Sequence, residues 1–290
     1  MNPLVKPSVI RQIMQKNGLR FQKRYGQNFL TSEMVLEKMI TSAGITKHDC
    51  VLEIGPGLGT LTWELASNTK QVVSIEIDQG LVNVLSETFK EFSNVTILHQ
   101  DILKTDLARV VEQQFDGTAP YLMANLPYYI TTPIIMHLLE SRIPFPNIII
   151  MIQKEVAQRI TASPGKKDYG VLTIAANFYA QPKILFHVPA SSFVPAPNVD
   201  SAVLSLTPRP HPTCRPQNQS AFFKVVKASF AQRRKTLLNS LSGAGCFQAS
   251  KEEIAQAITA AEIDPQSRGE TLSMEQLCNL ADIFCKKGLI

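Results

Sequence analysis

Short runs rich in β-branched residues alternate with amphipathic segments of helical length between residues 50 and 207. Parallel strands need a long crossover, usually a helix, so this alternation predicts a Rossmann-like α/β fold with a doubly wound, mostly parallel seven-stranded sheet. A proline-rich loop alone joins the last two strands, and we expect them to form an antiparallel hairpin at the sheet edge. The expected strands are residues 50–54, 71–75, 95–98, 121–124, 148–152, 183–187 and 201–207, with helices at 81–92 and 133–140 among the connections.

A proline-rich stretch divides the chain. Residues 208–216 hold four prolines in nine positions, which excludes a helix or a central strand and predicts a stiff linker. Beyond it the pattern is helical and shows no strand signal. We therefore expect a basic N-terminal segment at 1–26, an α/β domain at 27–207, the linker at 208–216 and a small all-α domain at 217–290.

The net charge of +5 is distributed unevenly over the 290 residues. Residues 1–26 contain six Lys and Arg and no acid, and residues 201–250 contain seven and again no acid. Residues 27–200 carry a net charge of −5 and residues 251–290 one of −3. An acidic body with two acid-free basic segments predicts that a polyanion is bound at two places.

Cysteine spacing and hydropathy exclude several classes of protein. The five cysteines have no C-x-x-C pair and no histidine partners, which argues against a disulfide framework and against a zinc site. No apolar run approaches the ~20 residues that span a bilayer. The basic segment resembles a transit peptide in charge, but it has one serine and runs directly into the stretch at 23–30. We therefore expect a cytoplasmic protein with no bound metal and no membrane partner.

A glycine-rich segment, VLEIGPGLGT at residues 51–60, follows the first strand and opens a helix. Nucleotides bind at this place in open α/β sheets, and glycine lets the backbone turn sharply and approach a ligand closely. The dinucleotide fingerprint G-x-G-x-x-G would need a glycine where the chain has Thr60, because its glycines stand at 55, 57 and 59. The segment therefore fits a cofactor that has no pyrophosphate.

Two carboxylates follow neighbouring strands. Glu76 ends the second strand, 21 residues after Gly55, where a carboxylate accepts hydrogen bonds from ribose hydroxyls of NAD or of S-adenosylmethionine alike. Asp101 follows the third strand and is placed to accept from an adenine amino group. Together these features resemble the class I S-adenosylmethionine-dependent methyltransferases. The resemblance implies that Gly55 and Gly57 line the methionine end, Glu76 binds the ribose and Asp101 binds the adenine.

The sequence Asn125-Leu126-Pro127-Tyr128 follows the fourth strand. Pro127 has no N–H and forces Leu126 into an extended conformation, which aims the Leu126 carbonyl into the site beside the Asn125 side-chain carbonyl. Two fixed acceptors hold an exocyclic amine toward the tetrahedral geometry in which its nitrogen can attack a sulfonium methyl group. Tyr128 supplies a ring on which a flipped base can stack. The motif resembles amino-group methyltransferases acting on adenine or cytosine amines and on glutamine side chains.

Three more stretches narrow the resemblance: KRYGQNFL at 23–30, SFVPAPNVDSAV at 192–203 and FAQRRKTLLNSL at 230–241. With the motifs above they resemble the ribosomal RNA adenine dimethyltransferase family over residues 20–285, most closely its bacterial small-subunit branch. The resemblance implies that Asn28 and Leu30 close over the cofactor and that Tyr128 and Phe193 sandwich the target adenine. It further implies that the cofactor is contacted by Gly55, Glu76, Asp101 and Asn125.

The second basic segment predicts a contact with RNA. Residues 221–241 place apolar side chains at helical spacing on one stripe and basic side chains on another, so we expect a helix whose basic face contacts phosphates. The expected RNA-binding residues, from both basic segments, are Lys23, Arg24, Lys224, Lys227, Arg233, Arg234 and Lys235.

The resemblance implies S-adenosylmethionine-dependent dimethylation of the N6 amines of two adjacent adenosines near the 3′ end of 16S rRNA, by a monomer acting on a partly assembled small subunit. A large-subunit (23S) adenine dimethyltransferase is one alternative, against which the tract at 230–241 speaks. A non-catalytic RNA- or DNA-binding assembly or transcription factor on the same fold is another, against which the intact motifs speak. An NAD-dependent oxidoreductase is disfavoured because Thr60 breaks the fingerprint and no proton donor accompanies it.

Overall fold

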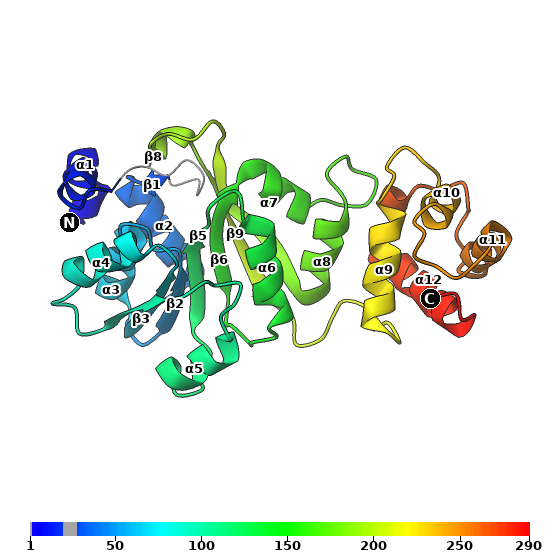
Figure 1. The fold of residues 1–290 in the computed structure, drawn as a ribbon, viewed down its shortest axis with the longest axis horizontal. Coiled ribbons are helices and arrows are strands. Elements are labelled where there is room, and N and C mark those ends of the chain that lie inside the picture. The colour runs from blue at the N-terminus through cyan, green and yellow to red at the C-terminus, as the bar shows by residue number, and fades with distance from the viewer. Residues whose placement is uncertain (1, 20–27) are drawn as a thin grey trace. The chain divides into compact units, whose positions relative to one another are not determined.

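The computed structural model describes residues 2–19 and 28–290 (Figure 1). The chain forms two compact units. The first, here called the sheet unit, consists of Met1–Ala157 and Gln181–Pro208. The second, the helical unit, consists of Gln158–Ala180 and Arg209–Ile290. Within the described residues, no helix is both long enough and apolar enough to cross a membrane.

The seven-stranded sheet has the order β4-β3-β2-β5-β6-β9-β7. The pairs from β4 to β6 are parallel, and β9 runs antiparallel to β6, which confirms a mostly parallel sheet with an antiparallel strand near one edge. Each predicted strand is present, and the most deeply buried parallel ones, β2, β3, β5 and β6, read in the sequence as nearly continuous apolar runs. The strands are β2 (Cys50–Ile54), β3 (Gln71–Glu76), β4 (Val95–His99), β5 (Tyr121–Asn125), β6 (Ile148–Gln153), β7 (Ala180–Val188) and β9 (Ser201–Pro208).

Helices connect the strands of the sheet unit. Two of them, α2 and α3, share an apolar cluster with inward-facing residues of β2, β5, β6 and β9, such as Met123 and Ile149, both 0% exposed. Parallel strands connected in this way bring their carboxyl ends, and the loops that follow them, to one edge of the sheet. The helices are α2 (Glu33–Ala43), α3 (Thr60–Asn68), α4 (Gln79–Thr88), α5 (Leu107–Phe115), α6 (Thr131–Glu140) and α7 (Lys154–Ile160), with a short turn η3 (Ala190–Ser192).

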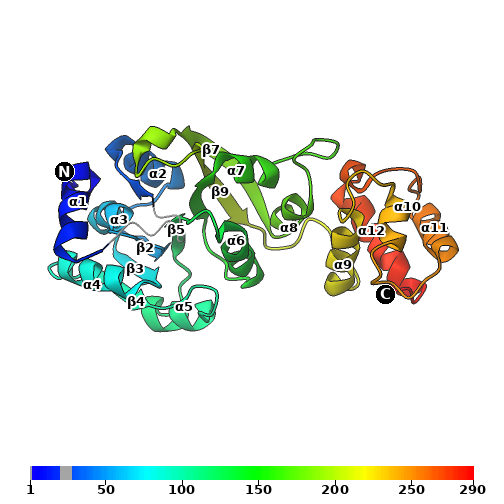
Figure 2. The same ribbon diagram turned by 45° about the horizontal axis from the view of Figure 1, so that its top comes forward.

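The described part of the basic N-terminal segment belongs to the sheet unit (Figure 2). It forms η1 (Pro3–Val5) and α1 (Pro7–Lys16), and α1 buries Ile10 and Met14 against Leu81 and Val84 of α4. The Asn2 amide donates a hydrogen bond of 2.9 Å to the Thr60 carbonyl. Further along, β1 (Phe29–Leu30) pairs antiparallel with β8 (Phe193–Val194). The expected RNA-binding residues Lys23 and Arg24 lie outside the described residues.

The helical unit includes residues 158–180, which the sequence pattern assigns to the α/β domain. The reason is the packing of α8, where Phe178 is 1% exposed and stacks on Phe222 of α9 with ring centroids 5.3 Å apart. Helical periodicity shows that a face is apolar but not which partner covers it. The helices are α8 (Val171–Tyr179), α9 (Gln219–Ser229), α10 (Leu237–Ser242), α11 (Lys251–Ala260) and α12 (Met274–Lys286), with a short turn η4 (Gly269–Thr271).

The prediction of one helix over 221–241 is wrong. Helix α9 ends at Ser229, and α10 begins after Thr236, whose hydroxyl caps it by accepting from the Asn239 N–H. Apart from the half-buried Phe230, the apolar residues of the stripe on either side of the break are buried, because two successive helices can bury them as well as one. The break places Arg233, Arg234 and Lys235 on an exposed turn instead of a helix face.

Candidate active site

A cavity of ≈ 130 Å³ lies at the carboxyl ends of β2 to β5 in the sheet unit. Its walls come from the loops after these four strands and from the segment at 28–30. The structure thereby brings together nearly all the site residues expected from sequence. Those that line the cavity are Asn28, Leu30, Gly55, Gly57, Glu76, Asp101, Asn125, Leu126, Pro127 and Tyr128.

The loop after β2 can lie close to a ligand in the cavity because it contains glycine. Gly57 has φ +61°, a left-handed conformation, and a Cβ atom there would lie 3.2 Å from the Phe29 ring. Its N–H points to the Glu76 carboxylate, at 3.3 Å from Oε2. The glycine-rich loop is therefore fixed to the end of the neighbouring strand.

Glu76 ends β3 and is only 6% exposed. Its Oε1 accepts hydrogen bonds of 2.9 Å from the N–H groups of Ile77 and Asp78, in addition to the bond from Gly57. Burial raises the pKa of this carboxyl group, and the three backbone donors oppose that shift. A carboxylate held in this way presents acceptors to a ribose diol.

Asp101 follows β4 and is more exposed. Its Oδ1 accepts a hydrogen bond of 3.0 Å from the Leu103 N–H, which closes the turn, and its Oδ2 lies 3.8 Å from Lys104 Nζ. The side chain keeps 27% of its surface accessible at the cavity. This arrangement is compatible with the expected contact to an adenine amino group.

Glu53 on β2 is a site residue that the sequence reasoning did not assign. It is 1% exposed, and its Oε2 accepts hydrogen bonds of 2.7 Å from Thr62 Oγ1 and from Ser74 Oγ. Its Oε1 has no hydrogen-bond partner among the described residues, although Glu53 lines the cavity. Burial raises the pKa of Glu53 to about 7. The first letter of E-x-G-x-G-x-G, a carboxylate inside an apolar strand, was the signal available in the sequence.

The Asn125–Tyr128 motif lies at the opposite wall. The Asn125 amide nitrogen donates to the Asn28 carbonyl at 3.4 Å, and the Leu126 N–H donates to the Met151 carbonyl at 3.0 Å. Tyr128 is held by a hydrogen bond of 2.8 Å between its hydroxyl group and Ser201 Oγ, and burial raises the Tyr128 pKa. Because the Asn125 amide nitrogen donates to Asn28, the orientation of the side chain is fixed and its Oδ1 serves as an acceptor.

Two groups of expected residues lie elsewhere. Phe193 pairs with Leu30 between β8 and β1, is 3% exposed and belongs to the apolar cluster, so it does not line the cavity. The expected RNA-binding residues within the described part of the chain are exposed in the helical unit, and of these Arg233 forms an ion pair with Glu270. They are Lys224, Lys227, Arg233, Arg234 and Lys235.

The cavity fits S-adenosylmethionine on structural grounds. The buried Glu53 Oε1 accepts no hydrogen bond from the described residues, which suits the cationic amine of the methionine end. Glu76 and Asp101 line the cavity after neighbouring strands, as acceptors for a ribose and for the adenine attached to it. The loop has Thr60 where the dinucleotide fingerprint needs a glycine. The mostly parallel sheet and this site define a class I methyltransferase that uses S-adenosylmethionine.

Comparison with known proteins identifies the family. The family model of the ribosomal RNA adenine dimethylases matches residues 18–286, and the chain belongs to this family. It is 46% identical over 280 residues to "Ribosomal RNA small subunit methyltransferase A" of Alkaliphilus metalliredigens (strain QYMF), covering 97% of each chain. It is 47% identical over 284 residues to the protein of that name from Streptococcus sanguinis (strain SK36), covering 97% of this chain and 98% of the relative.

Solved structures show the same fold. A dimethyladenosine transferase from Plasmodium falciparum matches with a TM-score of 0.72 and 26% identity, covering 90% of this chain and 98% of the other. A 23S rRNA methyltransferase, ErmE, matches with a TM-score of 0.63 and 24% identity, covering 88% and 99%. The likeness extends over nearly the whole chain, so the helical unit is part of the shared architecture.

Proposed function

We propose that this protein dimethylates the N6 amines of two adjacent adenosines near the 3′ end of 16S rRNA, within a partly assembled small ribosomal subunit. The observation that carries the proposal is the position of the Asn125–Tyr128 motif, which lines the same cavity as Glu53, Glu76 and Asp101. The two relatives at 46–47% identity, both named for the small subunit, support this subunit over the large one.

The residues on the β2 to β4 side of the cavity bind and orient the cofactor. Glu76 accepts from the ribose hydroxyls, Asp101 from the adenine amino group, and Gly55 and Gly57 leave room for the methionine chain. Asn28 and Leu30 close over it. When bound, S-adenosylmethionine supplies a methyl group on a positively charged sulfonium sulfur.

The β5 side binds the substrate amine. Asn125 Oδ1 and the Leu126 carbonyl accept the two N–H bonds of the adenine N6, which turns the nitrogen lone pair toward the methyl group. The amine becomes acidic as it is alkylated, so no strong base is required of the chain. For the second transfer the monomethylated amine keeps one N–H, so the second methylation requires that the pocket accommodate the first methyl group.

Stacking holds the flipped base. Tyr128 is one of the aromatic rings that line the cavity, and its bond to Ser201 keeps that ring in one orientation. Phe193, expected to cover the other face of the base, packs beside Leu30 in the described structure and reaches a base only if β8 shifts.

The helical unit, which contains the domain expected at 217–290, supplies the contact with RNA outside the cavity. Its exposed basic residues face phosphates, and the segment with Lys23 and Arg24 adds a second contact. We propose that the protein works as a cytoplasmic monomer, since the ribosomal RNA is itself the large partner that both units bind.

Transfer of labelled methyl groups tests this function. The protein is incubated with radiolabelled S-adenosylmethionine and, separately, with small subunits lacking the modification, unmodified large-subunit RNA and duplex DNA. The proposal predicts label in N6,N6-dimethyladenosine from the small subunits alone. Label in the large-subunit RNA would favour that alternative, and binding of RNA without transfer would favour a non-catalytic factor.

A further inference from the structure

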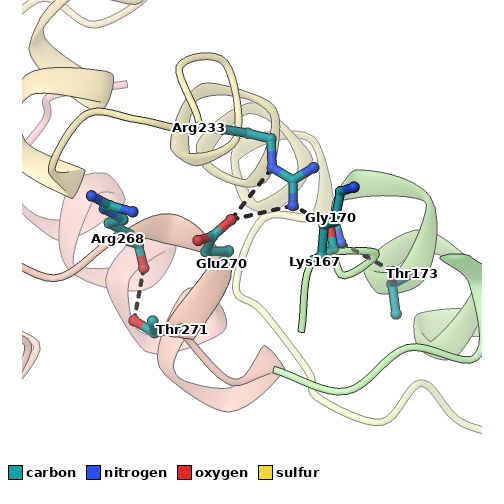
Figure 3. Close-up of polar contacts among 7 residues, drawn as sticks. All are labelled: Lys167, Gly170, Thr173, Arg233, Arg268, Glu270 and Thr271. Carbon is teal, nitrogen blue, oxygen red and sulfur yellow. Dashed lines mark hydrogen bonds and ion pairs between the residues drawn. The ribbon is translucent and has the colours of Figure 1, made fainter. Parts of the chain in front are cut away.

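Arg233 is engaged by protein groups of the helical unit (Figure 3). Its Nε and Nη2 both donate to Glu270 Oε2 at 3.3 Å, and Nη2 also donates to the Lys167 carbonyl. Arg233 lies in the turn between α9 and α10, Glu270 in η4, and Lys167 in the loop at 163–169. One guanidinium group therefore joins three segments that are far apart in the sequence.

Further bonds tie the same loop at both of its ends. The Gly165 N–H donates to the Glu270 carbonyl at 2.8 Å. At the other end, the Tyr169 hydroxyl donates to the Leu272 carbonyl at 2.8 Å, and the Tyr169 ring, 5% exposed, packs edge-on against Phe230 at 5.7 Å. The loop at 163–169 is thus held against η4 and the end of α9. Arg233, whose side chain is half exposed, adds the bonds on the solvent side.

The three joined segments carry five exposed cations besides Arg233. The charge distribution along the sequence does not reveal this, because Lys166 and Lys167 fall in the net acidic stretch at 27–200 and Arg268 in the acidic stretch that follows 250. The three segments also hold two acids, of which Asp168 is exposed and Glu270, with 25% of its side chain exposed, is paired with Arg233. The exposed basic residues of the three segments, other than Arg233, are Lys166, Lys167, Arg234, Lys235 and Arg268.

We infer that Arg233 is a positioning residue, which through Glu270 holds these five cations as one RNA-binding surface. The inference rests on the proposed function, since it names how that RNA is bound. An arginine is required because its planar fork directs donors to a carboxylate and to a carbonyl at once, which a lysine ammonium on a flexible stem does not do. A carboxylate is tolerated within a polyanion-binding surface because it is paired and places the loop.

The direction in which Glu270→Ala changes the affinity for RNA distinguishes a positioning role from a purely electrostatic one. Removing a carboxylate from a surface that binds RNA strengthens binding if charge alone matters. The inference predicts the opposite for Glu270→Ala, about a 5- to 20-fold loss of affinity for unmethylated small subunits, and a similar loss for Arg233→Lys, which keeps the charge. The double variant is expected to lose no more than Arg233→Lys alone, because that substitution already removes the contact between Arg233 and Glu270.

Salt dependence provides the matched control. The dissociation constant is measured over a series of KCl concentrations for the wild type, Glu270→Ala, Arg233→Lys and Arg234→Ala. Arg234→Ala removes a phosphate contact and should reduce the slope of log affinity against log salt by about 0.7–0.9. Glu270→Ala and Arg233→Lys should bind more weakly than the wild type, but their slopes should stay closer to the wild-type slope than the slope of Arg234→Ala does.

Hydrogen exchange reports on the loop without RNA. The Gly165 amide should exchange about tenfold faster in Glu270→Ala and Arg233→Lys and unchanged in Arg234→Ala, with α9 and α12 as protected as in the wild type. Wild-type affinity in Glu270→Ala or Arg233→Lys, or unchanged exchange at Gly165, would overturn the inference while leaving the proposed function intact. A wild-type protein that fails to bind small subunits would contradict the proposed function and the RNA-binding part of the inference together.

Discussion

The Tyr128 hydroxyl lies 2.8 Å from Ser201 Oγ, so the ring that follows β5 is anchored to the first residue of β9, two strands away in the sheet. The anchor restricts the rotation of a half-buried aromatic side chain at the cavity. A base that stacks on a fixed ring meets it already oriented, and less conformational entropy is lost on binding.

Substitutions of Tyr128 and Ser201 distinguish the contribution of the Tyr128 ring from that of its hydrogen bond to Ser201. Tyr128→Phe and Ser201→Ala each remove one hydrogen bond worth about 1 kcal/mol, so each should lower kcat/KM about 5-fold. Tyr128→Ala also removes the stacking surface, about 1–3 kcal/mol, and should lower kcat/KM by a further factor of roughly 5 to 150. Methylation of small subunits at limiting substrate measures both effects. Full activity in Tyr128→Ala would contradict the stacking role.

Asn125→Ala removes the side-chain acceptor while leaving the Leu126 carbonyl in place. Loss of one fixed group that stabilises developing charge costs about 10²–10³ in rate, and we expect at least that decrease in the single-turnover rate. Binding of small subunits should stay within about threefold of the wild type, because the RNA surface is elsewhere. A single-turnover rate within threefold of the wild type would show that Asn125 has no part in the chemistry.

Glu53→Gln tests the buried carboxyl group through the pH dependence of stability. Burial raises the Glu53 pKa from 4.5 to about 7, so between these values the folded protein keeps a proton that the unfolded chain has released. This contribution is complete below pH 4.5 and is lost as the pH rises to about 7, a change of about 3 kcal/mol. Gln, which does not titrate, lacks this dependence.

The wild type should therefore lose stability relative to Glu53→Gln as the pH rises from about 5 to 8. Urea unfolding followed by the fluorescence of Trp63 measures this, because it is the single tryptophan and packs between Phe89 and Phe92 in the sheet unit. A difference in unfolding free energy that stays constant over this range would contradict the raised pKa.

Gly59→Ala tests a packing role within the glycine-rich motif. Gly59 has φ +87°, and a Cβ atom there would lie 2.4 Å from the buried Phe89 ring. Gly44 has φ +69° and nothing within 4 Å, so Gly44→Ala is a control for backbone strain alone. We expect Gly44→Ala to cost about 1 kcal/mol of unfolding free energy and Gly59→Ala about 2–4 kcal/mol. Equal losses would show that the Phe89 contact is unimportant.

Much of the sheet unit is predictable from sequence because its signals are local. A buried parallel strand is a continuous apolar run with polar ends, so β2 to β6 begin at the predicted residues. The cavity follows from the same logic, since residues placed after successive parallel strands meet at one edge. Gly59 shows the limit of such reasoning, because its partner Phe89 lies 30 residues further on and explains that glycine by packing instead of by ligand approach.

The helical unit was less predictable because its contacts are non-local. The stripe at 221–241 suits one helix as well as two, and Thr236, a good N-cap residue, was the only local sign of the break. Arg233 resembles a phosphate ligand in its basic stretch, yet its partner Glu270 lies 37 residues away. Similarly, the importance of Glu53 depends on Thr62 and Ser74, which only the folded sheet brings to it.

If one cavity delivers methyl groups to two adenosines of small-subunit RNA, the number of transferred groups and their positions are fixed, and both can be measured. Unmethylated small subunits are incubated with the protein and excess S-adenosylmethionine until transfer stops, and the digested RNA is analysed by mass spectrometry. We expect a plateau of four methyl groups per particle, all in two adjacent N6,N6-dimethyladenosines near the 3′ end. Methyl groups on any other nucleoside, or a plateau without dimethyladenosine, would contradict this expectation.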